Sequence, residues 1–380
     1  MSIAHLLALH DLSEIGSVRL KALLEYFGDA EAAWNNFDEW PQALRQPQPN
    51  YQLLWAEMQK QDLTALEERF LRSGAGVVTL NEPHYPRLLA SIVDAPYLLF
   101  YRGELPDDDD LCIAVIGSRK ATAYGREAAS FFAKGLARAG AWIVGGLARG
   151  IDTCGHRGAI DAGGKTIGVL GCGIDVVYPR ENLRLFEDVA ANGCIVSEYP
   201  LGMQPLAKNF PIRNRIVSGL SRGVIVVEAE LRSGTQITVD HALEQGRNIY
   251  AVPGSIFSPA SAGVHRMIRD YGFKLVDSPN DVLEDYPQGV MYGASGVAAA
   301  SVQQSLFPAA EAAAPSAFAP AALSPDEHRL WDALVVQRHF NDLAAAMDMD
   351  ASALAALLTI CELRGFIKRL DGQYYVRSTL

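Results

Sequence analysis

Residues 201–222 hold the side chains best suited to chemistry in this chain, because they combine cations and an aromatic ring without any acid. The cations are Lys208, Arg213, Arg215 and Arg222, and the ring is Phe210. Guanidinium groups beside an exposed ring suit a single nucleic-acid strand, whose phosphates need cations and whose bases need a stacking surface. We expect a basic, aromatic loop held by the apolar strand 223–228 that follows it. The alternative is that these arginines pair with carboxylates elsewhere, as many surface charges do, and the segment by itself favours neither.

The charge of the chain is unevenly distributed. The net charge of −11 and the pI near 5.2 argue, taken alone, against a nucleic-acid partner. Between Leu111 and Asp285, however, 19 Lys and Arg face 17 Asp and Glu, so this region has a net charge of +2 and the rest carries −13. The acidity therefore lies outside the central region, and DNA binding remains possible there.

Composition bounds the class of protein. A chain of 380 residues with 49% hydrophobic and 20% charged residues is typical of a soluble globular protein with two or three domains. Residues 1–10 have no basic start and only a short apolar run, so we expect neither a secretory signal nor a membrane span, and a cytoplasmic location. Five cysteines without Cys-x-x-Cys spacing indicate reduced, partly buried thiols, with no disulfide, metal or cofactor.

Short apolar runs alternate with amphipathic stretches between residues 111 and 285. This rhythm predicts an α/β fold with an extended, Rossmann-like, doubly wound sheet that is largely parallel. The expected strands are 112–116, 142–144, 166–170, 194–197, 224–227, 248–252 and 274–276. Loops that leave the carboxyl ends of such strands form a ligand crevice. Here those loops are rich in glycine and arginine, at 117–120, 145–150, 171–173 and 228–234.

The region before the sheet domain predicts a helical domain. Residues 1–78 read as an all-α, SAM-like or helix-hairpin-helix domain with Gly16 in its turn, and residues 79–286 as the sheet domain. Only Arg19 and Lys21 lie near that turn, so packing or a protein contact is favoured there over a phosphate contact.

The region after the sheet domain predicts a linker and a winged helix. Residues 287–322 are rich in Ala, Pro, Ser and Gly and have no Lys or Arg, so we expect a flexible linker. In residues 323–380, Ser324 starts a helix, two more are expected at 341–347 and 350–363, and a hairpin turns at Asp371-Gly372. The helix 350–363 has no cation, which favours a protein contact over reading a DNA groove.

Two phosphate-binding motifs are only superficially present. The segment 158–166 resembles a phosphate loop, but its glycine spacing is one residue too long and it leads from a helix into a strand, so we exclude a built-in ATPase. The first strand ends in Gly117-Ser118-Arg119 instead of Gly-x-Gly-x-x-Gly, which gives no support for a dinucleotide site.

The competing function is a nucleotide-binding, phosphoribohydrolase-like enzyme on the same type of sheet. Residues 233–235, Ser-Gly-Thr, follow the fifth strand, where cytokinin-activating phosphoribohydrolases carry Pro-Gly-Gly-x-Gly-Thr-x-x-Glu. Thr238 occupies the place of the catalytic Glu, so hydrolysis would lack its acid–base group. His156 and His241 have no obvious Ser or Cys partner in the sequence, and we interpret them as structural or loop-orienting.

A series of short motifs indicates a family. The motifs are 116–119 with Tyr124-Gly125, 145–152 with His156, 171–175 with Tyr178-Pro179 and Asn182, Ser197-Glu198, 210–221, 227–229, 233–235, 244–247 and 251–254. Together they closely resemble the DprA (Smf) family of bacterial DNA-processing proteins over roughly residues 80–280. The helical and winged-helix regions on either side are also similar to those of full-length members. The small departures at Cys154, Asp161 and Thr235 put little in doubt.

The resemblance implies a non-enzymatic protein that binds single-stranded DNA as a homodimer. Such a protein shields incoming DNA during natural transformation and helps the RecA recombinase replace single-strand-binding protein on it. The DNA-binding residues that carry over from the family are Arg119, Lys208, Phe210, Arg213, Asn214 and Arg215. The cations among them suit phosphates, the ring suits a base, and further phosphate contacts are expected from the amides of Gly117, Ser118, Gly145 and Gly146.

One short peptide in the linker suggests another partner. Residues 303–307, Gln-Gln-Ser-Leu-Phe, resemble the Gln-x-x-Leu-Phe peptide by which bacterial proteins dock on the replication sliding clamp. The alternative is a sticky linker patch that matches by chance.

Overall fold

The computed structural model describes residues 2–44 and 48–286 and, in the C-terminal region, 324–334, 338–339, 343, 346–347, 349, 351–364, 366–370 and 374–377. The chain divides into two compact units, Met1–Val297 and Ala298–Leu380. The expected linker 287–322, with its peptide 303–307, and the expected turn at 371–372 lie outside the described residues, and of the expected helix 341–347 only single positions are described.

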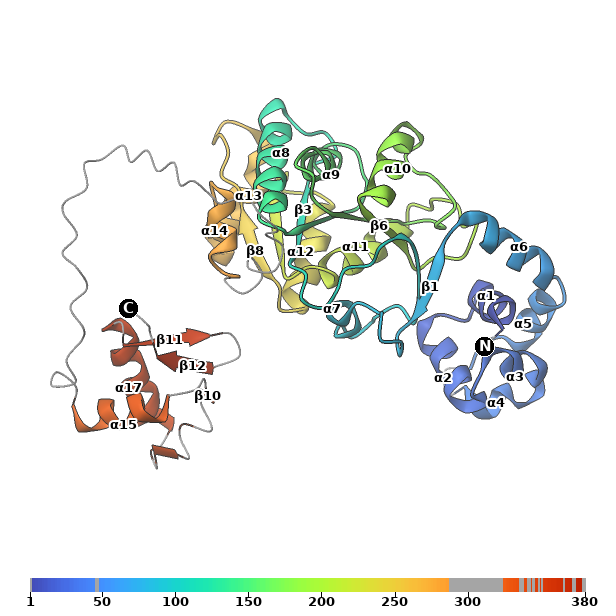
Figure 1. The fold of residues 1–380 in the computed structure, drawn as a ribbon, viewed down its shortest axis with the longest axis horizontal. Helices are drawn as coiled ribbons and strands as arrows, with labels where there is room; N and C mark the ends of the chain where they lie inside the picture. Colours follow the sequence, from blue (N-terminus) through green and yellow to red (C-terminus); the bar gives the residue numbers. More distant parts are fainter. Residues whose placement is uncertain are drawn as a thin grey trace. The chain divides into compact units, whose positions relative to one another are not determined.

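A nine-stranded sheet forms the centre of the first unit, in the order β1-β2-β6-β5-β4-β3-β7-β8-β9 (Figure 1). Its strands are β1 Gly76–Thr79, β2 Leu98–Gly103, β3 Cys112–Gly117, β4 Trp142–Gly145, β5 Thr166–Val169, β6 Gly193–Ser197, β7 Gly223–Glu228, β8 Asn248–Ala251 and β9 Lys274–Leu275. The seven strands from β3 to β9 are parallel to one another, which confirms the predicted doubly wound sheet.

The sequence did not predict the strands β1 and β2. β1 and β2 pair antiparallel with each other, and β2 pairs antiparallel with β6. Only the short helix α7, Arg87–Ala90, lies between β1 and β2, and no helix lies between β2 and β3, so neither strand shows the long helical connection that made the parallel strands recognisable. Antiparallel neighbours do not need such a crossover. β1 also crosses the predicted domain boundary between residues 78 and 79.

Helices cover both faces of the sheet (Figure 1). They are α7 Arg87–Ala90, α8 Ala123–Arg138, α9 Ile151–Asp161, α10 Leu183–Ala191, α11 Asn209–Gly219, α12 Thr235–Glu244, α13 Ala262–Tyr271 and α14 Pro279–Leu283, with 3-10 turns η2 Arg180–Asn182 and η3 Pro259–Ser261. Alternate side chains of β3 point to opposite faces of the sheet. Ile113 and Val115 pack against α8 and α9. Ala114 and Ile116 pack on the side of α11 and α12. This two-residue period is that of a buried strand.

Residues 209–219 form helix α11, so the prediction of a loop there was wrong. Pro211 lies in the first turn, where the backbone N–H groups have no partner within the helix, so a proline is tolerated. Ile216, Val217 and Leu220 are buried in the core beside the sheet and hold the helix in place. The sequence did not predict this helix, because Pro211 and the cations Arg213 and Arg215 interrupt its short apolar face.

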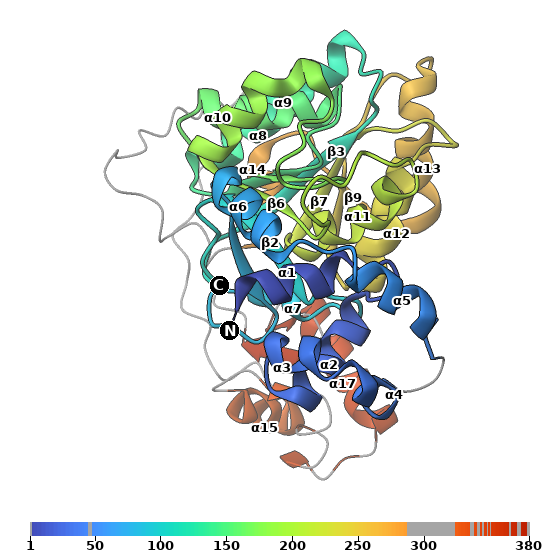
Figure 2. The ribbon, with the colours of Figure 1, turned by 90° about the vertical axis from the view of Figure 1, so that its right-hand side faces the viewer.

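In the described residues before the sheet the helices are α1 Ile3–Asp11, α2 Ser17–Phe27, α3 Ala30–Asn35, α4 Trp40–Ala43, α5 Tyr51–Met58 and α6 Leu63–Ser73, with the 3-10 turn η1 Phe37–Glu39. They gather beside β1 and β2 (Figure 2). Their core, around Leu9, Leu20 and Trp40, continues without a break to Phe100 and Ile195 of the sheet.

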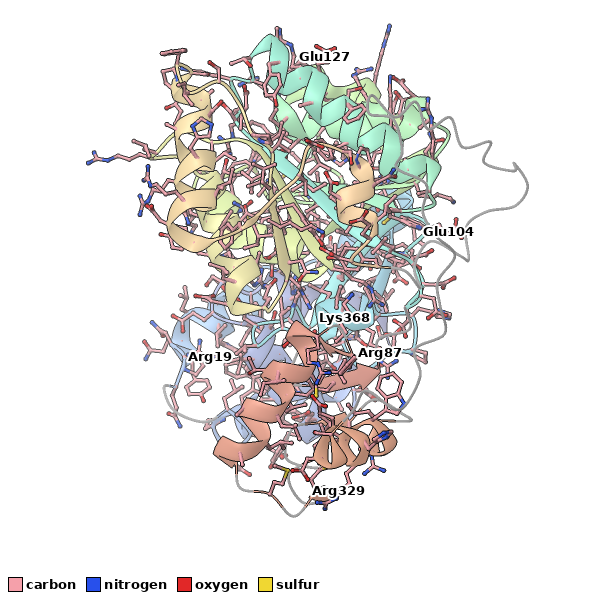
Figure 3. The ribbon with its side chains drawn as sticks, turned by 90° about the vertical axis from the view of Figure 1, so that its left-hand side faces the viewer. Arg19, Arg87, Glu104, Glu127, Arg329 and Lys368 are labelled. Carbon is pink, nitrogen blue, oxygen red and sulfur yellow. The ribbon has the colours of Figure 1, made fainter. Side chains whose placement is uncertain are left out.

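The turn between α1 and α2 carries the predicted hairpin. Arg19, which is labelled in Figure 3, donates a hydrogen bond to the carbonyl oxygen of Glu14 at 2.7 Å. Lys21 lies 3.8 Å from the carboxylate of Glu25. Both cations near Gly16 therefore have partners within the helical region, which agrees with a packing role for this hairpin. Among the described residues no helix is long and apolar enough to cross a membrane.

The second unit contains α15 Pro325–Ala333, α17 Ala351–Leu363 and a small antiparallel sheet in the order β10-β12-β11, with β10 Arg338–His339, β11 Ile367–Leu370 and β12 Tyr374–Arg377. Ser324 and Glu327 form a capping box at the start of α15, as predicted. Leu330, Leu354 and Phe366 belong to its core. Helices followed by a hairpin are the arrangement expected of a winged helix.

Replacing Phe100 with alanine should lower the free energy of unfolding by about 3–5 kcal/mol. The ring is fully buried in the core shared by the N-terminal helices and the sheet. Urea unfolding followed by circular dichroism measures the change. Phe131→Ala on α8, where the residue is 52% exposed, is the matched control and should cost less than about 0.5 kcal/mol. Equal losses in both variants would contradict a shared core.

Candidate nucleic-acid interface

A cavity of about 410 Å³ opens at the carboxyl edge of the sheet, where the strand order reverses beside β3. Doubly wound sheets bind their ligands at this place, and the volume lies in the range of small-ligand pockets. The lining residues are Ile116 to Lys120, Gly146, Ala148, Asp152, Phe210, Pro211, Arg213, Asn214, Val217, Glu230, Ser233 to Thr235, Ile237 and Thr238. Four segments that are far apart in sequence thus build one site.

The structure brings together seven of the ten predicted site residues: Gly117, Ser118, Arg119, Gly146, Phe210, Arg213 and Asn214. Gly145 is buried directly before Gly146 at the end of β4. Lys208 is exposed at the N-cap of α11 and does not line the cavity. Arg215 lies on another face of α11.

Arg213 is a buried cation in the cavity wall. It is only 3% exposed, and its Nη1 donates hydrogen bonds to the carbonyl oxygens of Gly146, at 2.9 Å, and Val169. Within the described part of the chain no carboxylate lies within ion-pair distance of it, and burial lowers the pKa of its guanidinium. Buried charges normally have a charged partner, so a cation in this position favours an anionic ligand in the cavity.

Asp152 is the carboxylate whose charge raises the pKa of Arg213, and its own oxygen accepts hydrogen bonds from backbone amides. Its carboxylate accepts hydrogen bonds from the N–H of Gly146 at 2.8 Å and of Ala148 at 3.4 Å. Burial raises the pKa of this carboxyl, while the charge of Arg213 and the two amides lower it. Asp152 therefore shapes the loop after β4 and offsets part of the charge of Arg213.

Phe210 presents a half-buried ring between cations. The guanidinium of Arg119 lies 5.6 Å from its centroid and that of Arg213 lies 5.9 Å away, both within cation–π range. The ring rests on the backbone of Gly171, where a Cβ atom would come within 2.9 Å of the Phe210 Cδ1. The glycine-rich loop after β5 thus makes room for this ring. The ring of Tyr178 also contacts that of Phe210, with a centroid distance of 5.3 Å.

Arg215 is paired with carboxylates and does not line the cavity, so its contact with DNA stays a prediction. Its two terminal nitrogens donate to the carboxylate of Glu198 at 2.5 and 2.6 Å, and its Nε lies 2.9 Å from a carboxylate oxygen of Asp94. Residues two apart on a helix point about 200° away from each other, so Arg213 and Arg215 cannot share a face. The alternative in which an arginine of this segment pairs with carboxylates is correct for Arg215.

Several lining residues were not predicted to bind DNA. Lys120 lies next to Arg119, and its N–H donates to the Ser118 hydroxyl at 3.1 Å. Ser233 to Thr235 stand at the start of α12, and Thr238 follows one turn later. In the sequence, Ser233 to Thr235 favour the competing enzyme. In the structure they line the same cavity as the residues that are predicted to bind DNA. Glu228, at the end of β7, holds the rim by accepting from the Thr122 N–H at 3.0 Å.

His156 lies in the core beside the loop after β4. The hydroxyl of Thr166 donates its one hydrogen to the carbonyl oxygen of Ile143 at 2.6 Å. The same hydroxyl oxygen can therefore only accept from His156, and Nδ1–H of His156 donates to it at 2.7 Å. The Nε2 atom is therefore unprotonated, and it is buried without a partner. A Cβ atom at Gly145 would come within 2.8 Å of it. His156 is thus buried in the core, as expected for a structural residue. The other histidine interpreted as structural, His241, lies 3.7 Å from Glu244 on α12.

These features define a class of protein: a doubly wound α/β protein with a cationic and aromatic crevice. Residues 76–287 match the family model described as DNA recombination-mediator protein A, and residues 314–373 match that of the DprA winged helix domain. The first match covers more than half of the 380 residues. The chain belongs to the family of DNA recombination-mediator protein A, which is also called DprA or Smf.

Two known proteins show the extent of the similarity. The DNA processing protein DprA of Streptococcus pneumoniae is 47% identical over 202 residues, which are 53% of this chain and 71% of that protein. Its X-ray structure matches with a TM-score of 0.65 and 37% identity, over 75% of this chain and 98% of that one. The Helicobacter pylori protein, whose structure concerns its single-stranded DNA binding mode, matches with a TM-score of 0.50 and 28% identity, over 56% and 99%.

Protonation of His156 should destabilise the fold at acid pH. Burial lowers its pKa to about 3 from the ordinary 6.5. Between these values the unfolded chain binds a proton that the folded chain does not, so stability falls as pH falls, by about 1.4 kcal/mol per pH unit from this group. Urea unfolding at pH 6.5 and 5.5 should show a smaller pH effect for His156→Gln than for the parent. The same slope in both proteins would contradict the assignment.

Proposed function

We propose that this protein binds single-stranded DNA at the cavity without reading its sequence. The observation that carries the proposal is the ring of Phe210 flanked by Arg119 at 5.6 Å, beside the buried Arg213. A ring between guanidinium groups offers a base a stacking surface and its phosphates a cation. The Helicobacter pylori relative, whose structure concerns single-stranded DNA binding, has the same fold, which supports the proposal.

Each group at the site has a physical role in this proposal. Arg119 and Lys120 lie at the opening of the cavity and hold phosphates, and the exposed Lys208 adds a cation just outside. Arg213 contacts a phosphate from inside the wall, where low dielectric strengthens the attraction. The amides of Gly117 and Ser118 donate hydrogen bonds to phosphate oxygens, as backbone nests do.

In the cell, we propose, the protein acts in natural transformation and recombination. It works as a homodimer in the cytoplasm, covers incoming single-stranded DNA, and promotes the loading of RecA where single-strand-binding protein is displaced. Membership of the DNA recombination-mediator family supports this role. The protein then needs no catalytic group and no cofactor. The sliding clamp is a further proposed partner, through residues 303–307.

The alternative proposal is a phosphoribohydrolase-like enzyme, because Ser233 to Thr235 line the same cavity. Thr238 stands there with 4% exposure at the place of the catalytic Glu of such enzymes. Of the lining carboxylates, Asp152 is held by two amides and Glu230 is exposed at the rim. The alternative predicts release of free base from nucleoside monophosphates, and chromatography after incubation with the protein tests it.

Arg119→Ala should weaken binding to fluorescently labelled poly-dT at least tenfold, because it removes a phosphate contact and one cation beside Phe210. Titrations across salt should also give a log–log slope that is shallower by about 0.7 for each phosphate that the variant leaves without a cation. Arg72→Ala is the matched control, since Arg72 is exposed on α6 and pairs with Glu68. A duplex of equal length should bind more weakly. Parent-like affinity of Arg119→Ala would move the site away from this cavity.

Phe210→Ala should weaken poly-dT binding by about 5- to 100-fold, because a base loses its stacking surface. The salt slope should stay at the parent value, since no cation is removed. The pair of variants therefore separates stacking from phosphate binding. A change of slope without loss of affinity at low salt would contradict the role given to Phe210.

RecA filament assembly tests the cellular role. On poly-dT covered with single-strand-binding protein, the parent protein should speed the formation of RecA filaments, and Arg119→Ala should not, because it no longer occupies the strand. ATP hydrolysis by RecA reports filament formation. Acceleration by both proteins would show that RecA loading does not depend on this cavity.

A further inference from the structure

We propose that Tyr178 is a second base-stacking surface, and that the DNA strand leaves the cavity across Phe210 toward it. The inference rests on the proposed single-stranded DNA binding. Tyr178 lies on the connection between β5 and α10, and its ring is 5.3 Å from that of Phe210 at an interplanar angle of 39°. The two rings come from segments 32 positions apart and meet at the edge of the site.

Tyr178 is available to a ligand. It is 41% exposed, and within the described part of the chain its hydroxyl makes no hydrogen bond. A tyrosine that served the fold alone would normally bury its ring and satisfy its hydroxyl. Here the ring lies against another ring that is itself only half buried, so the pair forms a continuous aromatic surface.

The spacing of the rings favours single strands. With a centroid distance of 5.3 Å the two rings contact each other, so no base fits between them and each base must rest on an outer face. Bases on the two outer faces are kept apart by the rings, as in an extended single strand. The 39° tilt between the rings has the same effect, because two bases stacked on tilted planes cannot stay parallel.

The charges on this side of the site suit a phosphate backbone. The acids of the connection are already paired: Asp175 with Arg69 at 2.8 Å, and Glu181 with Arg149. Arg180 is exposed on the same connection and Arg184 is exposed in the first turn of α10 that follows it, and the described residues include no ion pair for either. Free cations beside a stacking ring are the combination that tracks a single strand.

The opposite direction along the sheet edge is less suitable. There the connection after β8 exposes Ile256 and Phe257, which are 80% and 89% accessible. Phe257 has no aromatic or cationic partner among the described residues, and Glu230 lines the cavity with a negative charge toward β7. Phe257 is thus an exposed ring without the cations that a strand needs, which makes it a matched control for Tyr178.

The experiment compares Tyr178→Ala, Tyr178→Phe, Tyr178→Leu and Phe257→Ala in the full chain, with oligo-dT of increasing length. Tyr178→Ala and Tyr178→Leu should weaken binding of long oligomers about tenfold, Tyr178→Phe should bind as the parent does, and Phe257→Ala should have no effect. Tyr178→Leu preserves bulk beside Phe210, so its loss of affinity reports stacking and not a misplaced Phe210. The oligomer length at which affinity levels off should shorten by about one nucleotide when the Tyr178 ring is removed.

The outcomes separate this inference from the proposed function. If the parent and all four variants bind equally while Phe210→Ala loses affinity, single-strand binding stands and the path across Tyr178 is wrong. A loss of affinity confined to Phe257→Ala would show that the strand leaves the cavity toward Phe257, and would contradict the path across Tyr178. Weak binding by Tyr178→Phe would show that the hydroxyl acts and stacking does not. Failure of the parent itself to bind oligo-dT would overturn the proposed function and, with it, this inference.

Discussion

A buried ion pair between Arg215 and Glu198 sets the orientation of α11, and the arrangement of the site depends on that orientation. The guanidinium is 8% exposed and the carboxylate 12%, with two hydrogen bonds between them. Bidentate pairs of this kind fix direction as well as distance. With Arg215 held toward the end of β6, Arg213 and Phe210 are turned toward the cavity.

The same residue, Glu198, connects the N-terminal helices to the site. His10 of α1 donates from Nε2 to the carbonyl oxygen of Glu198 at 2.8 Å, and burial lowers the pKa of its imidazole, which favours the neutral form. One residue after β6 therefore contacts the N-terminal helices through its backbone and α11 through its side chain. Leu9 and Phe100 belong to one continuous core, so the helical region packs against the sheet that carries the cavity.

The cavity combines residues that suit two kinds of ligand, a nucleotide and single-stranded DNA. Residues that resemble a nucleotide hydrolase, Ser233 to Thr235, and residues that suit DNA, Arg119 and Phe210, line the same cavity. Both kinds of ligand carry a phosphate, and doubly wound sheets bind their ligands where the strand order reverses, which here is beside β3. The difference lies in single side chains: a threonine at 238 in place of a carboxylate, and a stacking ring at 210.

Much of this protein follows from its sequence because the signals are local. Short apolar runs that alternate with amphipathic stretches predicted all seven parallel strands, and the capping box at Ser324 predicted α15. The motifs predicted the family, and seven of the predicted site residues lie in the cavity wall. What the tertiary structure alone decided depends on contacts between distant segments. Whether 209–219 is a loop or a helix, and which of two arginines faces the cavity, is set by the packing of Ile216 and by Glu198. The contact of Tyr178 with Phe210 likewise exists only once two connections meet at one edge of the sheet, because no pattern along the chain records which loops become neighbours.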